Sequence, residues 1–174
     1  DWSSDVCSSD LMIALEGVCV IAGPTGTREL PVEKFCTGPG KNALAKGELL
    51  ISLKFPPPKP NSGAAYLRFI PRNEMDIAVV GVAASVVLDE KGETFVSARI
   101  GLGAVGPTPY YVEEAGRRLA DQPVSEATIE KAAAAARDMA RPIDDMRGTK
   151  EFRLHVTGVL TRRVIEEAVK RARS

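Results

Sequence analysis

The sequence predicts an α+β fold in which an antiparallel sheet of three to four strands packs against three helices. Runs of small, branched and aromatic residues at 64–69, 77–88 and 94–102 are typical of strands. After residue 108 the apolar residues recur at the spacing of a helix. Because the strands all precede the helices, we expect a sheet that helices cover on one face.

A proline-rich segment at residues 56–60 marks the predicted boundary between this domain and a smaller preceding part. Proline lacks the amide donor that a sheet interior or a helix requires. Before this segment, residues 11–22 indicate a buried strand and residues 23–26 the turn of a hairpin. Residues 31–35 favour a single helical turn, and residues 48–55 a further strand.

Three helices are predicted after the sheet. Thr108 can cap the first helix, with Pro109 at its first position and its end near Leu119. Ser125 can cap the second, alanine-rich helix, and the third begins after Thr149.

Composition excludes several functional classes. The 23 basic and 23 acidic side chains balance, so no charge pattern points to nucleic acid or to an anionic membrane. The longest apolar run, residues 77–88, is too short to span a bilayer. Three cysteines without metal-ligand spacing indicate reduced thiols, and no signal peptide is recognised, so we expect a cytoplasmic protein.

Two glycine patterns imitate nucleotide-binding motifs, and neither is predicted to bind phosphate. Residues 101–106 match G-x-G-x-x-G after a strand, but Pro107 and Pro109 remove amide donors from the next turn. Residues 38–41 resemble part of a P-loop without its Ser or Thr. The single histidine, His155, has no partner at ligand spacing, so we predict no metal site and no catalytic residue.

Acidic residues precede the third predicted helix, in the sequence Asp144-Asp145-Met146-Arg147-Gly148. Paired aspartates can indicate a metal site or acid catalysis. We favour a loop in which Asp and Arg pair with each other and with backbone donors, and a contact with another subunit is the alternative.

Three passages resemble, in order, the FAD-binding medium subunit of molybdenum hydroxylases, the group that contains aerobic carbon monoxide dehydrogenase and xanthine dehydrogenase. They are GELLISLKFPPPKPNSGAAYLRFIPRNEMDIAVV at residues 47–80, ARIGLGAV followed by Thr-Pro at residues 98–109, and RPIDDMRG followed by Glu-Phe-Arg at residues 141–153. The resemblance implies that residues 11–56 end a PCMH-type FAD-binding domain. Residues 62–174 would then form the flavoprotein C-terminal domain of that family.

The resemblance implies an electron-transfer flavoprotein subunit. A [2Fe-2S] small subunit would pass electrons to FAD, which reduces an external acceptor such as NAD, a quinone or oxygen. The molybdenum cofactor would lie in a large subunit, and the complex would be a dimer of heterotrimers. The alternative is a non-catalytic assembly module that docks partner subunits.

The first ten residues, DWSSDVCSSD, resemble the translation of a sequencing-library adapter. We predict that residues 1–10 are a non-native leader that contributes nothing to the fold, and an ordinary polar N-terminus is the alternative. The glycine-rich FAD segments of the family are expected upstream of Leu11. On this interpretation the chain is a C-terminal fragment, inactive alone.

Leu50 and Arg68 are the predicted FAD-binding residues. In the resembled family, a basic residue two after a Tyr, here Tyr66, approaches the flavin ring, and an apolar residue of the preceding strand packs on it. A nearby cation stabilises negative charge on the ring. The family more often has Lys at this position, whereas Arg is a planar, permanently charged donor. The alternatives are a solvent-exposed Arg68 and a core Leu50; Asp76 is predicted to pair with Arg72.

Overall fold

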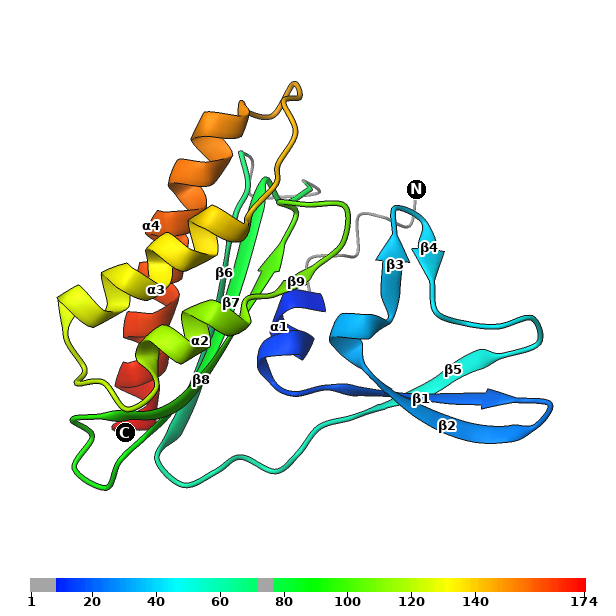
Figure 1. The fold of residues 1–174 in the computed structure, drawn as a ribbon, viewed down its shortest axis with the longest axis horizontal. Coiled ribbons are helices and arrows are strands. Elements are labelled where there is room, and N and C mark those ends of the chain that lie inside the picture. The colour runs from blue at the N-terminus through cyan, green and yellow to red at the C-terminus, as the bar shows by residue number, and fades with distance from the viewer. Residues whose placement is uncertain (1–8, 72–76) are drawn as a thin grey trace.

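The computed structural model describes residues 9–71 and 77–174, which form two parts lying side by side (Figure 1). The N-terminal part, residues 9–55, is a small antiparallel sheet with two short helical elements. The C-terminal part, residues 61–174, is a larger antiparallel sheet with three helices. The predicted α+β class is confirmed.

The N-terminal part is built on a sheet with the strand order β2-β1-β5. Its strands are β1 (Val18–Gly23), β2 (Gly26–Pro31) and β5 (Leu49–Lys54). β1 and β2 pair antiparallel with Gly23 opposite Gly26, so the predicted hairpin turn is confirmed. Gly26 has a φ of 121°, a conformation that glycine adopts without a steric penalty.

Short elements fill the chain between β2 and β5. They are the 3-10 helix η2 (Val32–Lys34), β3 (Cys36–Gly38) and β4 (Lys41–Asn42). Glu48 fixes the chain just before β5, because its carboxylate accepts two hydrogen bonds of 2.7 Å from Arg28 and one of 2.6 Å from the Ala45 N–H. Since Arg28 lies on β2, these bonds hold the start of β5 beside the hairpin.

The chain before β1 contains a short helix, α1 (Ser9–Ala14), where a strand was predicted. A short run of apolar residues does not distinguish a strand from a buried helix, and here the strand begins only at Val18. The side chain of Asp10 is fully buried in α1. The prediction that residues 1–10 contribute nothing to the fold is therefore wrong for Asp10.

The sheet of the C-terminal part has four strands in the order β6-β7-β8-β9, and all neighbours are antiparallel. The strands are β6 (Ser62–Phe69), β7 (Val80–Leu88), β8 (Phe95–Gly103) and β9 (Tyr110–Tyr111). The three long strands agree with the three predicted runs. β9 is short and extends the sheet beyond β8.

Three helices follow the sheet: α2 (Glu113–Leu119), α3 (Glu126–Met139) and α4 (Lys150–Ala172). Ser125 caps α3 as predicted, and α4 begins after Thr149 as predicted. The side chains of both residues accept hydrogen bonds from backbone N–H groups in the first turn of the helix. The predicted cap at Thr108 is wrong. The chain there pairs with β8 as β9, and α2 begins only after Val112.

The two faces of the C-terminal sheet are covered by different elements. Ile100 and Leu102 are fully buried in the cluster that includes residues of α2, α3 and α4. Gly101 points to the opposite face, since successive strand residues alternate. A Cβ added there would lie 2.3 Å from the Asp10 carbonyl oxygen. Helix α1 therefore packs on the second face, and the prediction of a sheet covered on one face is corrected.

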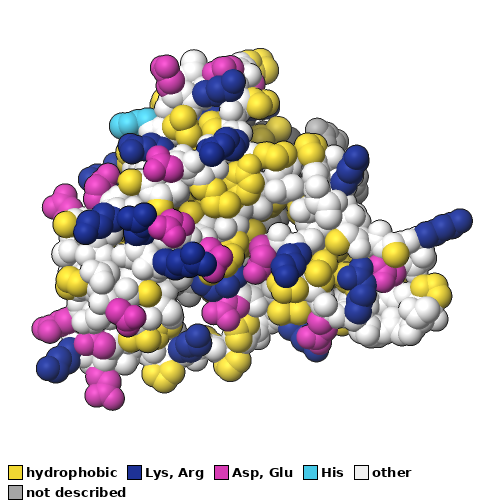
Figure 2. Space-filling model, viewed as in Figure 1, with side chains coloured by type: hydrophobic (Ala, Val, Ile, Leu, Met, Phe, Trp, Pro, Cys, Tyr) yellow, Lys and Arg dark blue, Asp and Glu magenta, His cyan; other side chains and the backbone are white. Residues whose placement is uncertain are grey.

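The buried apolar residues form two clusters, a smaller one before the proline-rich segment in the sequence and a larger one after it. The smaller cluster contains Ile13, Cys19, Ile21 and Val32, and Tyr111 of the C-terminal part packs against it. The larger cluster fills the space between the C-terminal sheet and its helices. On the face seen in Figure 2, acidic and basic side chains are interspersed over the helices. Within residues 9–71 and 77–174, no helix is long and apolar enough to cross a bilayer.

Candidate functional site at the junction of the two parts

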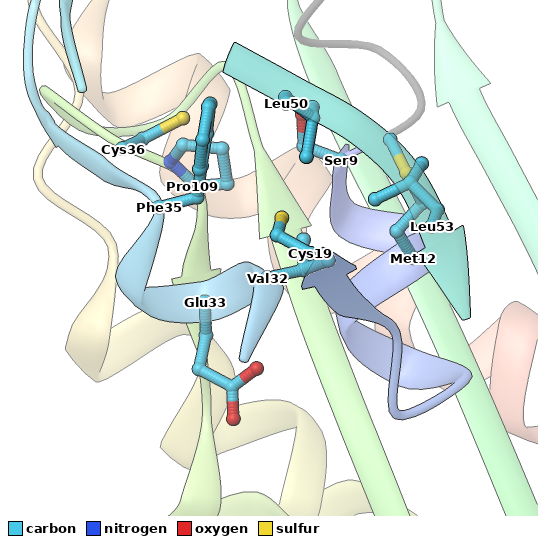
Figure 3. A pocket seen from close by; sticks show the side chains of 10 residues that line it. All are labelled: Ser9, Met12, Cys19, Val32, Glu33, Phe35, Cys36, Leu50, Leu53 and Pro109. Atoms are coloured by element: carbon cyan, nitrogen blue, oxygen red, sulfur yellow. The ribbon is translucent and has the colours of Figure 1, made fainter. Parts of the chain in front are cut away.

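An apolar hollow of about 180 Å³ lies in the N-terminal part where that part meets the C-terminal part (Figure 3). Side chains from α1, β1, η2, β3, β5 and nearby loops line it: Ser9, Met12, Cys19, Val32, Glu33, Phe35, Cys36, Leu50, Leu53 and Pro109. In Figure 3 the carboxylate of Glu33 points away from the other lining side chains. The walls of the hollow are therefore mainly apolar.

Leu50, one of the two predicted FAD-binding residues, lines this hollow. It lies on β5 opposite Ile21 of β1, and it is 39% exposed. Its neighbour Leu49 points to the other face of the strand and is 70% exposed. In this structure Leu50 is therefore a half-exposed wall of the hollow and not a closed core residue.

Arg68, the other predicted residue, lies on β6 opposite Gly81 of β7, with an exposed side chain. Strand alternation places it on the sheet face that α1 occupies. It does not line the hollow. Arg72 and Asp76, the predicted ion pair that follows it, lie outside the described residues.

The start of α1 is the feature that both predicted residues approach. Ser9 lines the hollow together with Leu50. The Oδ2 atom of Asp10 lies against Gly81, which is the strand partner of Arg68. Leu50 thus lines the same hollow as the first residue of α1, whereas Arg68 lies outside the hollow, on the strand next to the position that Asp10 contacts.

The carboxyl group of Asp10 has a strongly shifted pKa. Burial raises this pKa from 3.8 to about 7, although the Leu11 N–H donates a hydrogen bond of 3.0 Å to Oδ1 and lowers it. Oδ2 has no hydrogen-bond partner among the residues that the structure describes. Perturbed acids often mark functional sites. Asp10 does not line the hollow, and we assign it no functional role.

Cys19 and Cys36 are free thiols that line the hollow. Burial raises the pKa of both thiols, so the reactive thiolate is disfavoured. Cys19 is 2% exposed and belongs to the core of the N-terminal part. Both cysteine side chains therefore contribute apolar surface to the wall of the hollow.

The sequence analysis missed Arg99 of β8, which joins the two parts beside the hollow. Its Nε donates to the Ile13 carbonyl oxygen at 3.1 Å, and its Nη2 pairs with Glu33 at 3.2 Å. The guanidinium carbon lies 4.0 Å from the centre of the Tyr111 ring. An arginine within a largely apolar strand was the available signal, because buried charges in proteins are paired.

The acidic loop before α4 has the structural role that was predicted for it. Asp145 accepts a hydrogen bond of 2.8 Å from the Arg147 N–H and pairs with buried Arg153 at 2.6 Å. These two partners hold the pKa of Asp145 below its ordinary value. Arg153 also donates to the carbonyl oxygens of Val79 and Ala104, so the loop is tied to the ends of β7 and β8.

The glycine pattern at residues 101–106 does not open a helix, because β9 follows it. The Tyr110 side chain packs on Gly106, where an added Cβ would lie 2.2 Å from the tyrosine oxygen. The pattern therefore lacks the helix start that a dinucleotide site requires. In the described ranges, no group of three or more His, Cys, Asp and Glu side chains is placed to hold a metal ion.

The hollow fits one portion of an FAD molecule. Leu50, Leu53 and Phe35 offer apolar surface of the kind that a flat aromatic ring requires. A volume of about 180 Å³ is below the roughly 300–1,000 Å³ of pockets that enclose whole ligands. The residues present therefore suit the flavin ring and not the complete dinucleotide.

Together, the fold and the hollow define an α+β domain joined to a second, smaller sheet, with a ring-sized apolar site where the two meet. Residues 65–168 match the family model described as CO dehydrogenase flavoprotein C-terminal domain. This match covers more than half of the chain, and the chain belongs to that family.

Individual relatives agree with this assignment. The chain is 36% identical over 150 residues to the xanthine dehydrogenase FAD-binding subunit of Escherichia coli O157:H7, covering 86% of this chain and 51% of that protein. It is 35% identical over 164 residues to the carbon monoxide dehydrogenase medium chain of Afipia carboxidovorans, covering 94% and 56%. The solved structure of reconstituted CO dehydrogenase from Oligotropha carboxidovorans superposes with a TM-score of 0.88 at 31% identity, over 97% of this chain and 59% of that chain. The chain thus spans about half the length of the curated relatives it matches.

Proposed function

We propose that the chain is part of the FAD-containing electron-transfer subunit of a molybdenum hydroxylase. Electrons would pass from a [2Fe-2S] subunit through FAD to an external acceptor such as NAD, a quinone or oxygen. The names of the relatives, an FAD-binding subunit and a dehydrogenase medium chain, support this proposal. The observation in the structure that carries it is the ring-sized apolar hollow lined by Leu50.

The other redox groups of the complex would belong to partner subunits. A large subunit would hold the molybdenum cofactor and a small subunit the [2Fe-2S] cluster, in a dimer of heterotrimers. One solved relative is described as a Cu,Mo-CO dehydrogenase, which supports molybdenum elsewhere in such complexes. The free thiols of Cys19 and Cys36 fit a cytoplasmic location.

Leu50 would pack against the face of the flavin ring. Two features of the N-terminal part hold it in place: the pairing of β5 with β1, and the hydrogen bonds of Glu48 that fix the chain just before β5. When bound, FAD supplies the capacity to accept electrons and pass them on. The chain itself supplies a wall that orients the ring and excludes water from its face.

Arg68 would supply positive charge near the edge of the same ring. Its side chain is exposed and lies on the sheet face where α1 begins, next to the strand position that α1 contacts. The positive charge of its guanidinium would stabilise any negative charge that the ring gains. The charge, rather than the forked geometry, carries this role.

The test is potentiometric titration of a flavin-loaded subunit that contains this chain. Arg68→Ala should lower the flavin reduction potential by about 20 mV or more, which corresponds to a charge interaction of about 1 kcal/mol in a solvated site. Arg68→Lys should largely preserve the potential. Arg117→Ala, on α2 in the helical layer, is the matched control.

Two results would count against this assignment. One is an Arg68→Ala subunit with the potential of the unmodified protein. The other is an equal shift in Arg117→Ala, which would indicate a general effect of net charge. A non-catalytic assembly module would bind no flavin, and no flavin potential would be measured.

A further inference from the structure

We propose that Arg99 is a positioning residue that holds the C-terminal part against the N-terminal part and so keeps the walls of the hollow together. This arrangement is a property of the chain itself. Its consequence for the flavin ring rests on the proposed function.

The contacts of Arg99 span both parts of the chain. Ile13 and Glu33 belong to α1 and η2 of the N-terminal part, and Tyr111 belongs to β9 of the C-terminal part. The guanidinium uses its donor edge for the first two partners and its flat face for the third. Lysine has one compact charge and no such face, so it can reproduce only part of this arrangement.

Each partner of Arg99 is a wall of the hollow or a close neighbour of one. Glu33 lines the hollow with its stem, while its carboxylate points away (Figure 3) and pairs with Arg99. Ile13 follows the lining residue Met12, and Tyr111 lies two positions after the lining residue Pro109. Arg99 does not line the hollow itself. It acts through one wall residue, Glu33, and through two residues that lie close to other walls in the sequence.

The ion pair between Arg99 and Glu33 is more buried than the ion pairs on the surface of helix α2. The side chains of Arg99 and Glu33 are only 20% and 21% exposed. Removing one partner of a desolvated pair leaves the other charge without compensation, which is costly. By contrast, Arg117 and Glu113 on α2 are 66% and 61% exposed, and such pairs contribute little. Arg117 is therefore the matched control.

The thiols of Cys19 and Cys36 provide a direct probe, because both line the hollow. The experiment measures the rate at which Ellman's reagent modifies them in the full chain, with Cys7→Ser in every variant to remove the third thiol. Arg99→Met should raise this rate about tenfold or more, which corresponds to a loss of about 1.4 kcal/mol of closing free energy. Arg99→Lys should restore part of the protection, and Arg117→Met should match the parent chain.

Local opening must be separated from global unfolding. The rates are therefore compared well below the thermal midpoint of each variant, with circular dichroism as the measure of folding. If Arg99→Met does not fold, Glu33→Gln removes one contact only and should raise the rate by a smaller factor. The proposal is overturned if the folded Arg99→Met or Glu33→Gln chain reacts at the parent rate. It is also overturned if Arg117→Met accelerates the reaction equally.

Lumiflavin, a flavin ring without the phosphate-bearing tail, extends the test to the proposed function. Arg99→Met should weaken lumiflavin binding although Arg99 does not line the hollow, and Arg99→Lys should recover part of it. A parent chain that does not bind lumiflavin would count against the proposed function. The thiol rates would still decide the role of Arg99.

Discussion

Buried charged side chains in this chain differ in how their charge is compensated. Arg153 is 4% exposed, and its guanidinium meets Asp145 and two backbone carbonyl oxygens. Asp10 is completely buried, and among the described residues its Oδ2 atom has no hydrogen-bond partner, while the Leu11 N–H donates to Oδ1. Its environment therefore favours the neutral acid.

Asp10→Asn should stabilise the chain at neutral pH and leave it unchanged at pH 3. The pKa of Asp10 is about 7 in the folded chain and 3.8 in the reference state, so ionisation disfavours folding as the pH rises from about 4 to about 7. Each pKa unit corresponds to about 1.4 kcal/mol, which makes the full effect a few kcal/mol. Thermal midpoints of both chains between pH 3 and pH 8 measure it. The same pH profile in both chains would refute the assignment.

The sequence predicts the role of a residue well where that residue interacts with close neighbours in the sequence. The cap Ser125 and the helix start after Thr149 were predicted correctly, and both side chains accept hydrogen bonds from N–H groups three residues away. Arg99 contacts residues that are 66 and 86 positions away, and no local pattern identifies such partners. The roles of Leu50 and Arg68 came from a family resemblance, and they remain predictions.

At the scale of elements, pairing with a neighbouring strand decided the structure at one point where the local sequence favours a helix. Thr108 followed by Pro109 is a favourable helix start, yet the chain continues as β9 because it completes the edge of β8. The opposite error occurred in α1, where an apolar run that suits a strand forms a helix on the C-terminal sheet. Both errors arise where an element packs against a distant part of the chain.

Glycine at position 101 is required for the packing of α1. A Cβ there would lie 2.3 Å from the Asp10 carbonyl oxygen, which is backbone and cannot rotate away. Gly101→Ala should therefore destabilise the chain by about 1–3 kcal/mol. Gly158 lies in α4 with nothing within 4 Å of an added Cβ, so Gly158→Ala should stabilise the chain by about 1 kcal/mol. Urea denaturation of the two variants measures both effects, and changes of the same sign would contradict this packing.

At the scale of the whole molecule, specific contacts join the two parts. Tyr111 packs on the small cluster, Arg99 bonds across the junction, and α1 lies on the C-terminal sheet. The fold class followed from the order of strands and helices in the sequence. The hollow did not, because its walls come from five separate elements and nearby loops that only the tertiary structure brings together.

The hollow should bind lumiflavin, with a dissociation constant on the order of 100 μM for a ligand of this size. Leu50→Asp should weaken binding at least about tenfold, because an unpaired charge in an apolar site is costly. Leu49→Asp changes the neighbouring residue on the other face of β5, which does not line the hollow, and should leave binding unchanged.

Quenching of lumiflavin fluorescence by the purified chain is the most direct test that this site accepts a flavin ring. The account predicts saturable quenching that Leu50→Asp abolishes and Leu49→Asp preserves. An absence of quenching by the unmodified chain, or equal loss in the two variants, would contradict it.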